Sequence, residues 1–363
     1  MLRLFCLSIF FVISNSYGQW TKCPTIVSER LVSIFADSTG LVLVGGIDGT
    51  LLKSNNFGQT LRIVKTDIKH TFEQFIKVND SLYLARIGND GGNVGWKMYY
   101  STDQGETWID NLSPSFHFRG LQIVNGKLYI GPWNYNGSPN QIYRSVDNGK
   151  TWKFLSNINT TLLTDNPLII DDSNWYVGGS DGLIMFTSDA GNTWEKQARG
   201  MTTAGLGGCI KVKDTVVVTN GPNIWAGYFK KDSWSNTYED PWYPGGTISY
   251  SGKYWWRSSQ RGTDYSSSVF KWEKGRCDVG FSRFFWVDTV GNGYAISGNN
   301  LYRTNNHGIM ITSVSDEEDV SVISETEVYF NLLGQQVLPK NNQLLFKFDK
   351  KRGIFSKLIY IEK

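Results

Sequence analysis

The stretch "YYSTDQGETW" occupies residues 99–108, and two near-copies follow it, "YRSVDNGKTW" at 143–152 and "FTSDAGNTW" at 186–194. All three contain the pattern Ser/Thr-x-Asp-x-Gly-x-Thr-Trp. The Asp side chain can accept hydrogen bonds from nearby backbone N–H groups, and the Gly can take a positive φ at no steric cost. The Trp carries a large apolar surface into a core as the return strand begins. The pattern therefore predicts a strand, a tight turn and a second strand.

The pattern assigns a structural role to the Asp, the Gly and the Trp of each copy. These residues are Asp103, Gly105, Trp108, Asp147, Gly149, Trp152, Asp189, Gly191 and Trp194. Two degraded copies, "KSNNFGQTL" at 53–61 and "RTNNHGIMI" at 303–311, have Asn where the others have Asp. Asn forms the same side-chain turn. We therefore expect Asn56 to close the first turn as Asp does in the complete copies.

The copies recur at nearly constant spacing. Successive copies begin 47, 44, 42 and 117 residues apart, at Ser54, Ser101, Ser145, Thr187 and Thr304. A period of about 42 residues is typical of β-propeller blades, each of which is a four-stranded sheet. The last gap leaves room for two units that have lost the phrase, with turns near Lys230 and Lys271. The spacing thus predicts seven blades, or six if one Trp-rich unit is an insertion.

Short apolar runs within each unit support this prediction. The first unit reads "LVSIF", "LVLVGG", "TLLKS" and "LRIVK", four runs separated by turn residues. The last unit reads "FFWVD", "GYAIS", "LYRT" and "IMITSV", so we expect residues 309–314 to supply its fourth strand. No stretch before residue 312 has the period of a long amphipathic helix. The fold class is therefore all-β, a propeller over residues 19–312.

The repeated phrase resembles the Asp-box of the BNR-repeat propellers. That superfamily holds sialidases, sortilin-type receptors, some glucanases and photosystem II assembly factors. The five copies frame nearly the whole predicted propeller. The resemblance implies that the box is a fold-stabilising turn placed away from the face that carries function, so the boxes say little about activity.

Both ends of the chain carry features of export. Residues 1–18 have one basic residue, Arg3, a short apolar run and then small and polar residues, as in a signal peptide. That run is too short to span a bilayer. An acidic linker, 313–320, precedes the final segment, 321–363. The stretches "VYFNLLGQQV" (328–337) and "KLIYIEK" (357–363) resemble the C-terminal sorting domain of the Bacteroidetes type IX secretion system, although the usual upstream Pro-Asn-Pro segment is absent.

The tail resemblance implies recognition by the type IX secretion machinery and a final location outside the cell or on the outer-membrane surface. The tail could be removed there. The alternative is a small β appendage packed on the propeller. We expect three short strands in this segment, because three apolar runs alternate with turn residues.

Composition excludes several function classes. A net charge of +3 is too small to favour the binding of nucleic acid. We also expect no transmembrane segment. His70, His117 and His307 are too few and too scattered for a metal centre, so we expect no metal and no cofactor. Cys23, Cys209 and Cys277 would remain after cleavage, which allows one disulfide at most. We expect a monomer.

A binding site can be predicted from loop lengths. If the box joins the third and fourth strands of a blade, then the loops after the second and fourth strands emerge on the opposite face. Several of these loops are long, at 86–96, 131–140, 220–227, 238–246 and 257–268. Together they carry aromatic side chains that can stack on sugars or apolar peptide groups, and arginines that can bind carboxylates. The candidate ligand-binding residues are Arg86, Trp96, Trp133, Tyr135, Trp225, Trp242, Tyr243, Arg257, Arg261 and Tyr265. The competing interpretation is that these aromatics only pack the loops together.

Catalysis has less support. The early segment reads "VSERLVSIF" and lacks the Phe-Arg-Ile-Pro-type motif of sialidases. Glycoside hydrolysis needs two carboxyl groups that flank one bond, and the candidates on this face are Asp90, Asp240 and Asp264. The sequence favours a non-catalytic protein that binds a glycan or an extracellular peptide. The alternatives are a glycoside hydrolase and a scaffold in a cell-surface assembly.

Overall fold

The structure is a computed structural model of the whole chain. Up to residue 309 it describes residues 16–17, 20–88, 97–110, 118–131, 141–158, 167–178, 183–197, 206–220, 223–239, 247–259, 262–272, 275–277 and 279–309. In the C-terminal tail it describes 327–330, 336–337, 343–349 and 354–361. The described residues form strands and turns without a helix. Within them no helix is long and apolar enough to cross a membrane.

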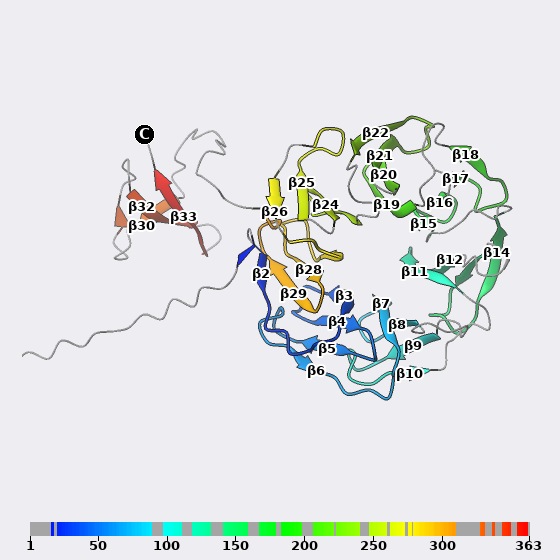
Figure 1. Cartoon of the computed structure of the whole chain (residues 1–363), viewed down its shortest axis with the longest axis horizontal. Coiled ribbons are helices and arrows are strands. Elements are labelled where there is room, and N and C mark those ends of the chain that lie inside the picture. The colour runs from blue at the N-terminus through cyan, green and yellow to red at the C-terminus, as the bar shows by residue number, and fades with distance from the viewer. Residues whose placement is uncertain are drawn as a thin grey trace, which may run out of the picture. The chain divides into compact units, whose positions relative to one another are not determined.

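Six four-stranded antiparallel sheets and one five-stranded sheet form a ring of seven blades, which confirms the predicted propeller and its blade number (Figure 1). In blades 1 to 6 the strands follow each other in chain order from the inside of the ring outwards. The strands of blades 1 to 3 are β3 (Leu31–Ala36), β4 (Val42–Gly46), β5 (Leu51–Ser54), β6 (Arg62–Ile63), β7 (Thr71–Lys77), β8 (Tyr83–Gly88), β9 (Lys97–Ser101), β10 (Ile109–Asp110), β11 (Arg119–Val124), β12 (Lys127–Gly131), β13 (Gln141–Ser145) and β14 (Lys153–Asn157).

The remaining blades follow the same plan. Their strands are β15 (Leu168–Ile169), β16 (Trp175–Gly178), β17 (Ile184–Thr187), β18 (Glu195–Gln197), β19 (Leu206–Val212), β20 (Thr215–Asn220), β21 (Asn223–Tyr228), β22 (Trp234–Glu239), β23 (Thr247–Tyr250), β24 (Trp255–Ser259), β25 (Gly262–Ser266), β26 (Gly275–Cys277), β27 (Arg283–Trp286), β28 (Gly293–Ser297) and β29 (Asn300–Thr304). The turns after β21 and β25 contain Lys230 and Lys271, so the two units without the phrase lie where the spacing predicts them.

The ring closes with an N-terminal strand, which corrects one sequence-based expectation. β2 (Trp20–Lys22) pairs with β29 through Thr21↔Arg303 and Lys22↔Tyr302, and it takes the place of the fourth strand of blade 7. Figure 1 shows β2 beside β29. The sequence predicts residues 309–314 in this place, and of these 310–314 lie outside the described residues. The ends of the propeller chain therefore meet in one sheet, and a short strand β1 (Ser16–Tyr17) continues it beyond β2.

Each box is closed by its own side chains. In the second copy Ser101 Oγ accepts from Gly105 N at 2.8 Å and donates to Asp103 Oδ1 at 2.8 Å. The Asp103 carboxylate in turn accepts from the backbone N of Thr107 at 2.9 Å and from its hydroxyl at 2.5 Å. The copies at 145–151 and 187–193 repeat these bonds. Asn56 accepts from the backbone N of Thr60 at 3.0 Å, so the amide serves where the carboxylate is missing.

Two successive residues of each box have a positive φ. The Gly does so as expected, and the residue before it does so too, although this position is never glycine. Those residues are Phe57, Gln104, Asn148, Ala190 and His307, with φ of 58°, 59°, 63°, 59° and 62°. A left-handed conformation is unfavourable for most of these side chains, Phe57 and Ala190 among them, whereas Asn148 tolerates it. The surrounding hydrogen bonds must therefore hold the backbone in this shape.

The hydrophobic core lies between the blades. The described buried residues form one cluster at each seam between neighbouring blades, including the seam between blades 7 and 1. Trp108, Trp152 and Trp194 pack against the clusters of the seams before blades 2, 3 and 4.

Side-chain amides form hydrogen bonds to the backbone of the next blade across two of these seams. Gln74 in β7 donates to Leu121 O at 2.5 Å and accepts from Leu121 N at 3.1 Å. Gln122 in β11 contacts Pro167 O and accepts from Ile169 N at 3.1 Å. The first strands of blades 2, 3 and 4 are therefore held in fixed register around the axis.

Residues 310–363 form a separate compact unit. Its four strands are β30 (Glu327–Phe330), β31 (Gln336–Val337), β32 (Gln343–Asp349) and β33 (Ile354–Ile361), in one antiparallel sheet of order β31-β30-β32-β33. The sequence predicts three strands here, and the additional one is the two-residue β31, which is too short to be recognised as an apolar run. The predicted linker 313–320 lies outside the described residues.

Candidate functional site

The propeller has two faces with different chemistry. The box face carries the turns at 54–61, 101–108, 145–152 and 187–194. The opposite face, here called the loop face, carries the turns after each second strand and the starts of the first strands. In blade 1, for example, Ile47 N donates to Arg30 O at 3.0 Å and Gly49 N donates to His70 O at 3.1 Å. The turn after β4 thus lies beside the first strands of blades 1 and 2, as the sequence predicts.

A charged cluster lies on the loop face near the ring axis, where the first strands of blades 7, 1 and 2 begin. Arg86 Nη1 lies 2.6 Å from Glu73 Oε2, and the Arg86 side chain is only 12% exposed. Glu73 belongs to the irregular start of β7, between Phe72 and Gln74, where the register shifts. An ideal Cβ on Gly88 would lie 2.1 Å from Glu73 Oε1, so the glycine leaves the space that this carboxylate occupies.

Two further arginines complete the cluster. Arg283 begins β27 and is exposed, and Arg30 directly precedes β3 and is also exposed. The surrounding protein partly desolvates Arg283, and this lowers the pKa of its guanidinium. The negative charge of Glu73 raises that pKa and the positive charge of Arg30 lowers it, so both groups lie within electrostatic reach. Arg86, Arg283 and Arg30 thus outnumber the one carboxylate of Glu73 in this group of charges, which leaves the group with a net positive charge.

Most of the predicted ligand-binding residues lie outside the described residues. These are Trp96, Trp133, Tyr135, Trp242, Tyr243 and Arg261, together with the candidate acids Asp90 and Asp240. Their roles stay predictions.

The predicted site residues that are described lie at strands rather than at loop tips. Arg257 in β24 is 2% exposed, and its Nη1 lies 4.0 Å from Asp264 Oδ2 on the neighbouring strand β25. Tyr265 packs on Trp256 with ring centroids 4.9 Å apart. Trp225 is half-buried against the cluster between blades 4 and 5. Of this described set, Arg86 is the member that the structure brings into the charged cluster.

Sequence reasoning missed Arg30, Glu73 and Arg283. Each stands at or next to the start of a first strand, but the three come from separate blades and no local pattern links them. Their common signal is a charged residue that directly follows the loop between two blades. Among the described residues no group of three His, Cys, Asp or Glu side chains is placed to hold a metal ion.

Comparison with known proteins agrees with the fold. Residues 99–108 match the BNR/Asp-box repeat family. No curated protein matches the chain. Among solved structures, YCF48 from Cyanidioschyzon merolae is 14% identical with a TM-score of 0.59, and the match covers 79% of this chain and 99% of that one. A structure of YCF48 bound to D1 peptide is 16% identical with a TM-score of 0.62, over 80% of this chain and 98% of that one.

A third similar structure is the GH74 xyloglucanase from Xanthomonas campestris, which is 12% identical with a TM-score of 0.61. That match covers 80% of this chain and 54% of the xyloglucanase. At such identities the likeness shows a shared propeller fold and leaves the ligand open. The chain is thus a seven-bladed β-propeller with Asp-box repeats.

Proposed function

We propose that this protein is a non-catalytic binding protein that holds a peptide or a glycan on its loop face. The observation that carries the proposal is the ion pair of Arg86 with Glu73, together with the exposed Arg283, which lies within electrostatic reach of both Glu73 and Arg30. Guanidinium groups bind carboxylates through paired, charge-assisted hydrogen bonds. A ligand that brings a carboxylate to the axis would balance the excess charge, and the aromatic residues of the long loops would flank it.

The solved neighbours support a binding role in a general way. One propeller of this fold is described with a bound peptide, and another is a xyloglucanase, which acts on a glycan. Both ligand classes therefore belong in the first screen. We also propose export, with residues 1–18 as a signal peptide and 321–363 as a type IX sorting tail, which would bring the loop face into contact with extracellular ligands.

The test is a binding screen on peptide and glycan arrays, followed by titration of the hits. We expect the double variant Arg30→Ala/Arg283→Ala to weaken binding by about 10-fold or more, since hydrogen bonds to charged groups contribute roughly 1.5–3 kcal/mol each. The matched control is Lys153→Ala/Lys196→Ala, which removes the same charge from the exposed outer strands β14 and β18. Equal binding by wild type and both variants would refute the axial arginines as the site.

The glycoside hydrolase remains the alternative function. Its described candidate, Asp264, lies beside Arg257 and is 22% exposed. Each glycan that binds is therefore also assayed for released product. Product formation that Asp264→Asn abolishes would replace the binding proposal by the enzyme. Binding to neither array by folded protein would favour a scaffold role.

A further inference from the structure

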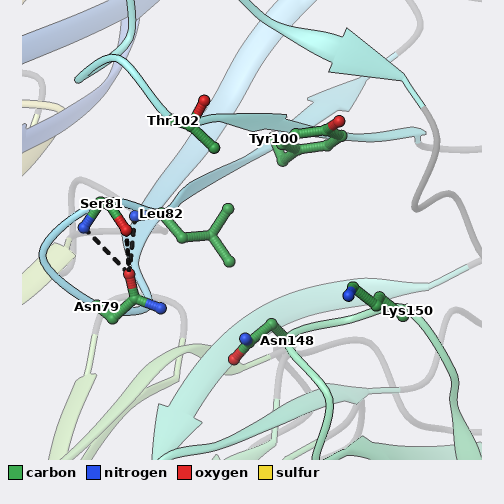
Figure 2. Close-up of a pocket in the computed structure, with 7 residues that line it drawn as sticks. All are labelled: Asn79, Ser81, Leu82, Tyr100, Thr102, Asn148 and Lys150. Carbon is green, nitrogen blue, oxygen red and sulfur yellow. Dashed lines mark hydrogen bonds between the residues drawn. The ribbon is translucent and has the colours of Figure 1, made fainter.

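A pocket of about 540 Å³ lies on the box face, between blades 2 and 3 (Figure 2). Blade 2 contributes the turn between β7 and β8 and the end of β9, and blade 3 contributes its box turn. The lining residues are Asn79, Ser81, Leu82, Tyr100, Thr102, Asn148 and Lys150. Ligand pockets are typically about 300–1,000 Å³, so this one has room for a small oligosaccharide or a similar ligand.

The neighbouring seam shows why this pocket is open. Lys53 and Tyr100 stand at the same place in their blades, one residue before the box Ser. Glu106 and Lys150 likewise match, each following the box Gly. Between blades 1 and 2, Lys53 Nζ lies 2.7 Å from Glu106 Oε1, and Arg62 contacts the same carboxylate.

That carboxylate closes the first seam. The Lys53 side chain is 3% exposed there. Burial raises the pKa of Glu106, but the bonds from Lys53 and Arg62 outweigh it and hold the pKa below its ordinary value. At the seam between blades 2 and 3, Lys150 stands at the position of Glu106, and Tyr100 stands at the position of Lys53. These two side chains cannot form an ion pair, and the space remains.

The side chains in this space have unused binding capacity. Lys150 is exposed and forms no ion pair with any described residue. Asn79 Oδ1 already accepts from Ser81 N at 3.1 Å and Leu82 N at 2.9 Å, which fixes the turn and leaves its Nδ2 as the group directed to a ligand. Tyr100 and Leu82 are half-buried and form an apolar wall. In Figure 2 they lie across the pocket from Asn148 and Lys150.

We propose that this pocket binds a uronic acid residue of an acidic oligosaccharide. The sugar carboxylate enters the space between Tyr100 and Lys150 and pairs with the Lys150 ammonium, so that it supplies the negative charge that Glu106 supplies at the first seam. The C–H face of the pyranose ring packs on Tyr100 and Leu82. The ring hydroxyls bond to Asn79 Nδ2, Asn148 and Thr102. This site is separate from the loop face, and it rests on different residues from the function proposed above.

The test is calorimetric titration of the whole protein with trigalacturonate, with maltotriose as the neutral sugar. We expect saturable binding of trigalacturonate and binding of maltotriose at least about 10-fold weaker, because one charge-assisted bond is lost. Lys150→Gln should weaken trigalacturonate binding by about the same factor. The matched control, Lys153→Gln, removes a neighbouring lysine of the same blade that does not line the pocket, and should bind as wild type does.

A double variant tests the comparison between the seams. Tyr100→Lys/Lys150→Glu recreates the pair of the first seam and should abolish trigalacturonate binding without lowering the thermal unfolding temperature. The proposal is overturned if trigalacturonate fails to bind, or if it binds wild type and Lys150→Gln equally. Tighter binding of maltotriose, or binding of a glutamate peptide in preference to trigalacturonate, would also overturn it.

Discussion

Replacing Trp20 by alanine tests how the propeller ring closes. Trp20 is 0% exposed and lies in the strand β2 that completes blade 7. Its ring centroid lies 5.1 Å from that of Phe281, 5.5 Å from that of Trp286 and 5.8 Å from that of Trp256. If β2 closes the ring, the substitution removes the centre of the cluster between blades 6 and 7. If another segment closes it, Trp20 is dispensable.

The expected cost can be worked from this packing. Truncation of a buried Trp to Ala costs roughly 3–5 kcal/mol, and the cost rises where the surroundings cannot collapse into the cavity. Here the turn at Gly308 packs so closely that an ideal Cβ on that glycine would lie 2.2 Å from Trp20 Nε1. Two walls of the cavity are the box turn, which its own hydrogen bonds close, and the packed aromatic cluster, so we expect little collapse into the cavity. We therefore expect the free energy of unfolding to fall by about 4 kcal/mol, a large part of the roughly 5–15 kcal/mol that stabilises a typical protein.

The assay is equilibrium unfolding in urea, followed by circular dichroism and by fluorescence. The control is Val290→Ala, at a side chain that is 68% exposed, which should change stability by less than about 0.5 kcal/mol. A double-mutant cycle with Trp256→Ala should give a coupling of about 0.5–1.5 kcal/mol for the edge-to-face pair. A loss of less than about 1 kcal/mol for Trp20→Ala would refute closure by β2.

Three further perturbations probe the boxes and the seams. Side-chain and backbone bonds from Thr151 lower the pKa of Asp147 from 3.8 to about 2. The ionised Asp147 therefore stabilises the folded protein fully above pH 3.8, and this contribution is lost as the pH falls towards 2. Asp147→Asn should make the urea midpoint less dependent on pH in this range. In Gly149→Ala the new Cβ meets no atom closer than 3.5 Å, so the positive φ alone should lower the free energy of unfolding by about 1–2 kcal/mol. Gly191→Ala would also place Cβ 2.5 Å from Ser156 Cβ, so urea unfolding should show a larger loss. Gln74→Ala should lower the free energy of unfolding by about 1–3 kcal/mol in the same assay, because the backbone N–H and C=O of buried Leu121 lose their hydrogen bonds to the Gln74 amide.

The box hairpins could be predicted from sequence because their interactions are local. Ser101, Asp103 and Thr107 bond within one turn, so the letters that specify the bonds lie side by side in the chain. The left-handed residue before each glycine could not be predicted. Phe57, Ala190 and the others share no side-chain property, and their conformation is set by the ring of hydrogen bonds around them.

The closing strand and the charged cluster depend on contacts between distant parts of the chain. β2 is only three residues long, and its partner β29 lies at the other end of the propeller. Arg30, Glu73 and Arg283 become neighbours only after blades 7, 1 and 2 have met around the axis. Loop length indicated the loop face as the one to search, because it depends on the strand order of one blade, and the proposed site lies on that face. It could not indicate which charges the ring would bring together.

The repeated turn also separates what must stay constant from what can vary on the box face. The polar side-chain atoms of the Ser or Thr, the Asp and the final Thr form hydrogen bonds within the turn. These residues therefore cannot be replaced to bind a ligand without destabilising the fold. The residue after the box Gly varies, and it is Glu106, Lys150 and Asn192 in three successive blades. At the first seam this position closes the gap with a carboxylate, and at the second it leaves a cation beside an aromatic ring. A fold that repeats one turn can therefore open a pocket between two blades by changing two residues beside the turn, while the hydrogen bonds of its Ser, Asp and Thr are kept.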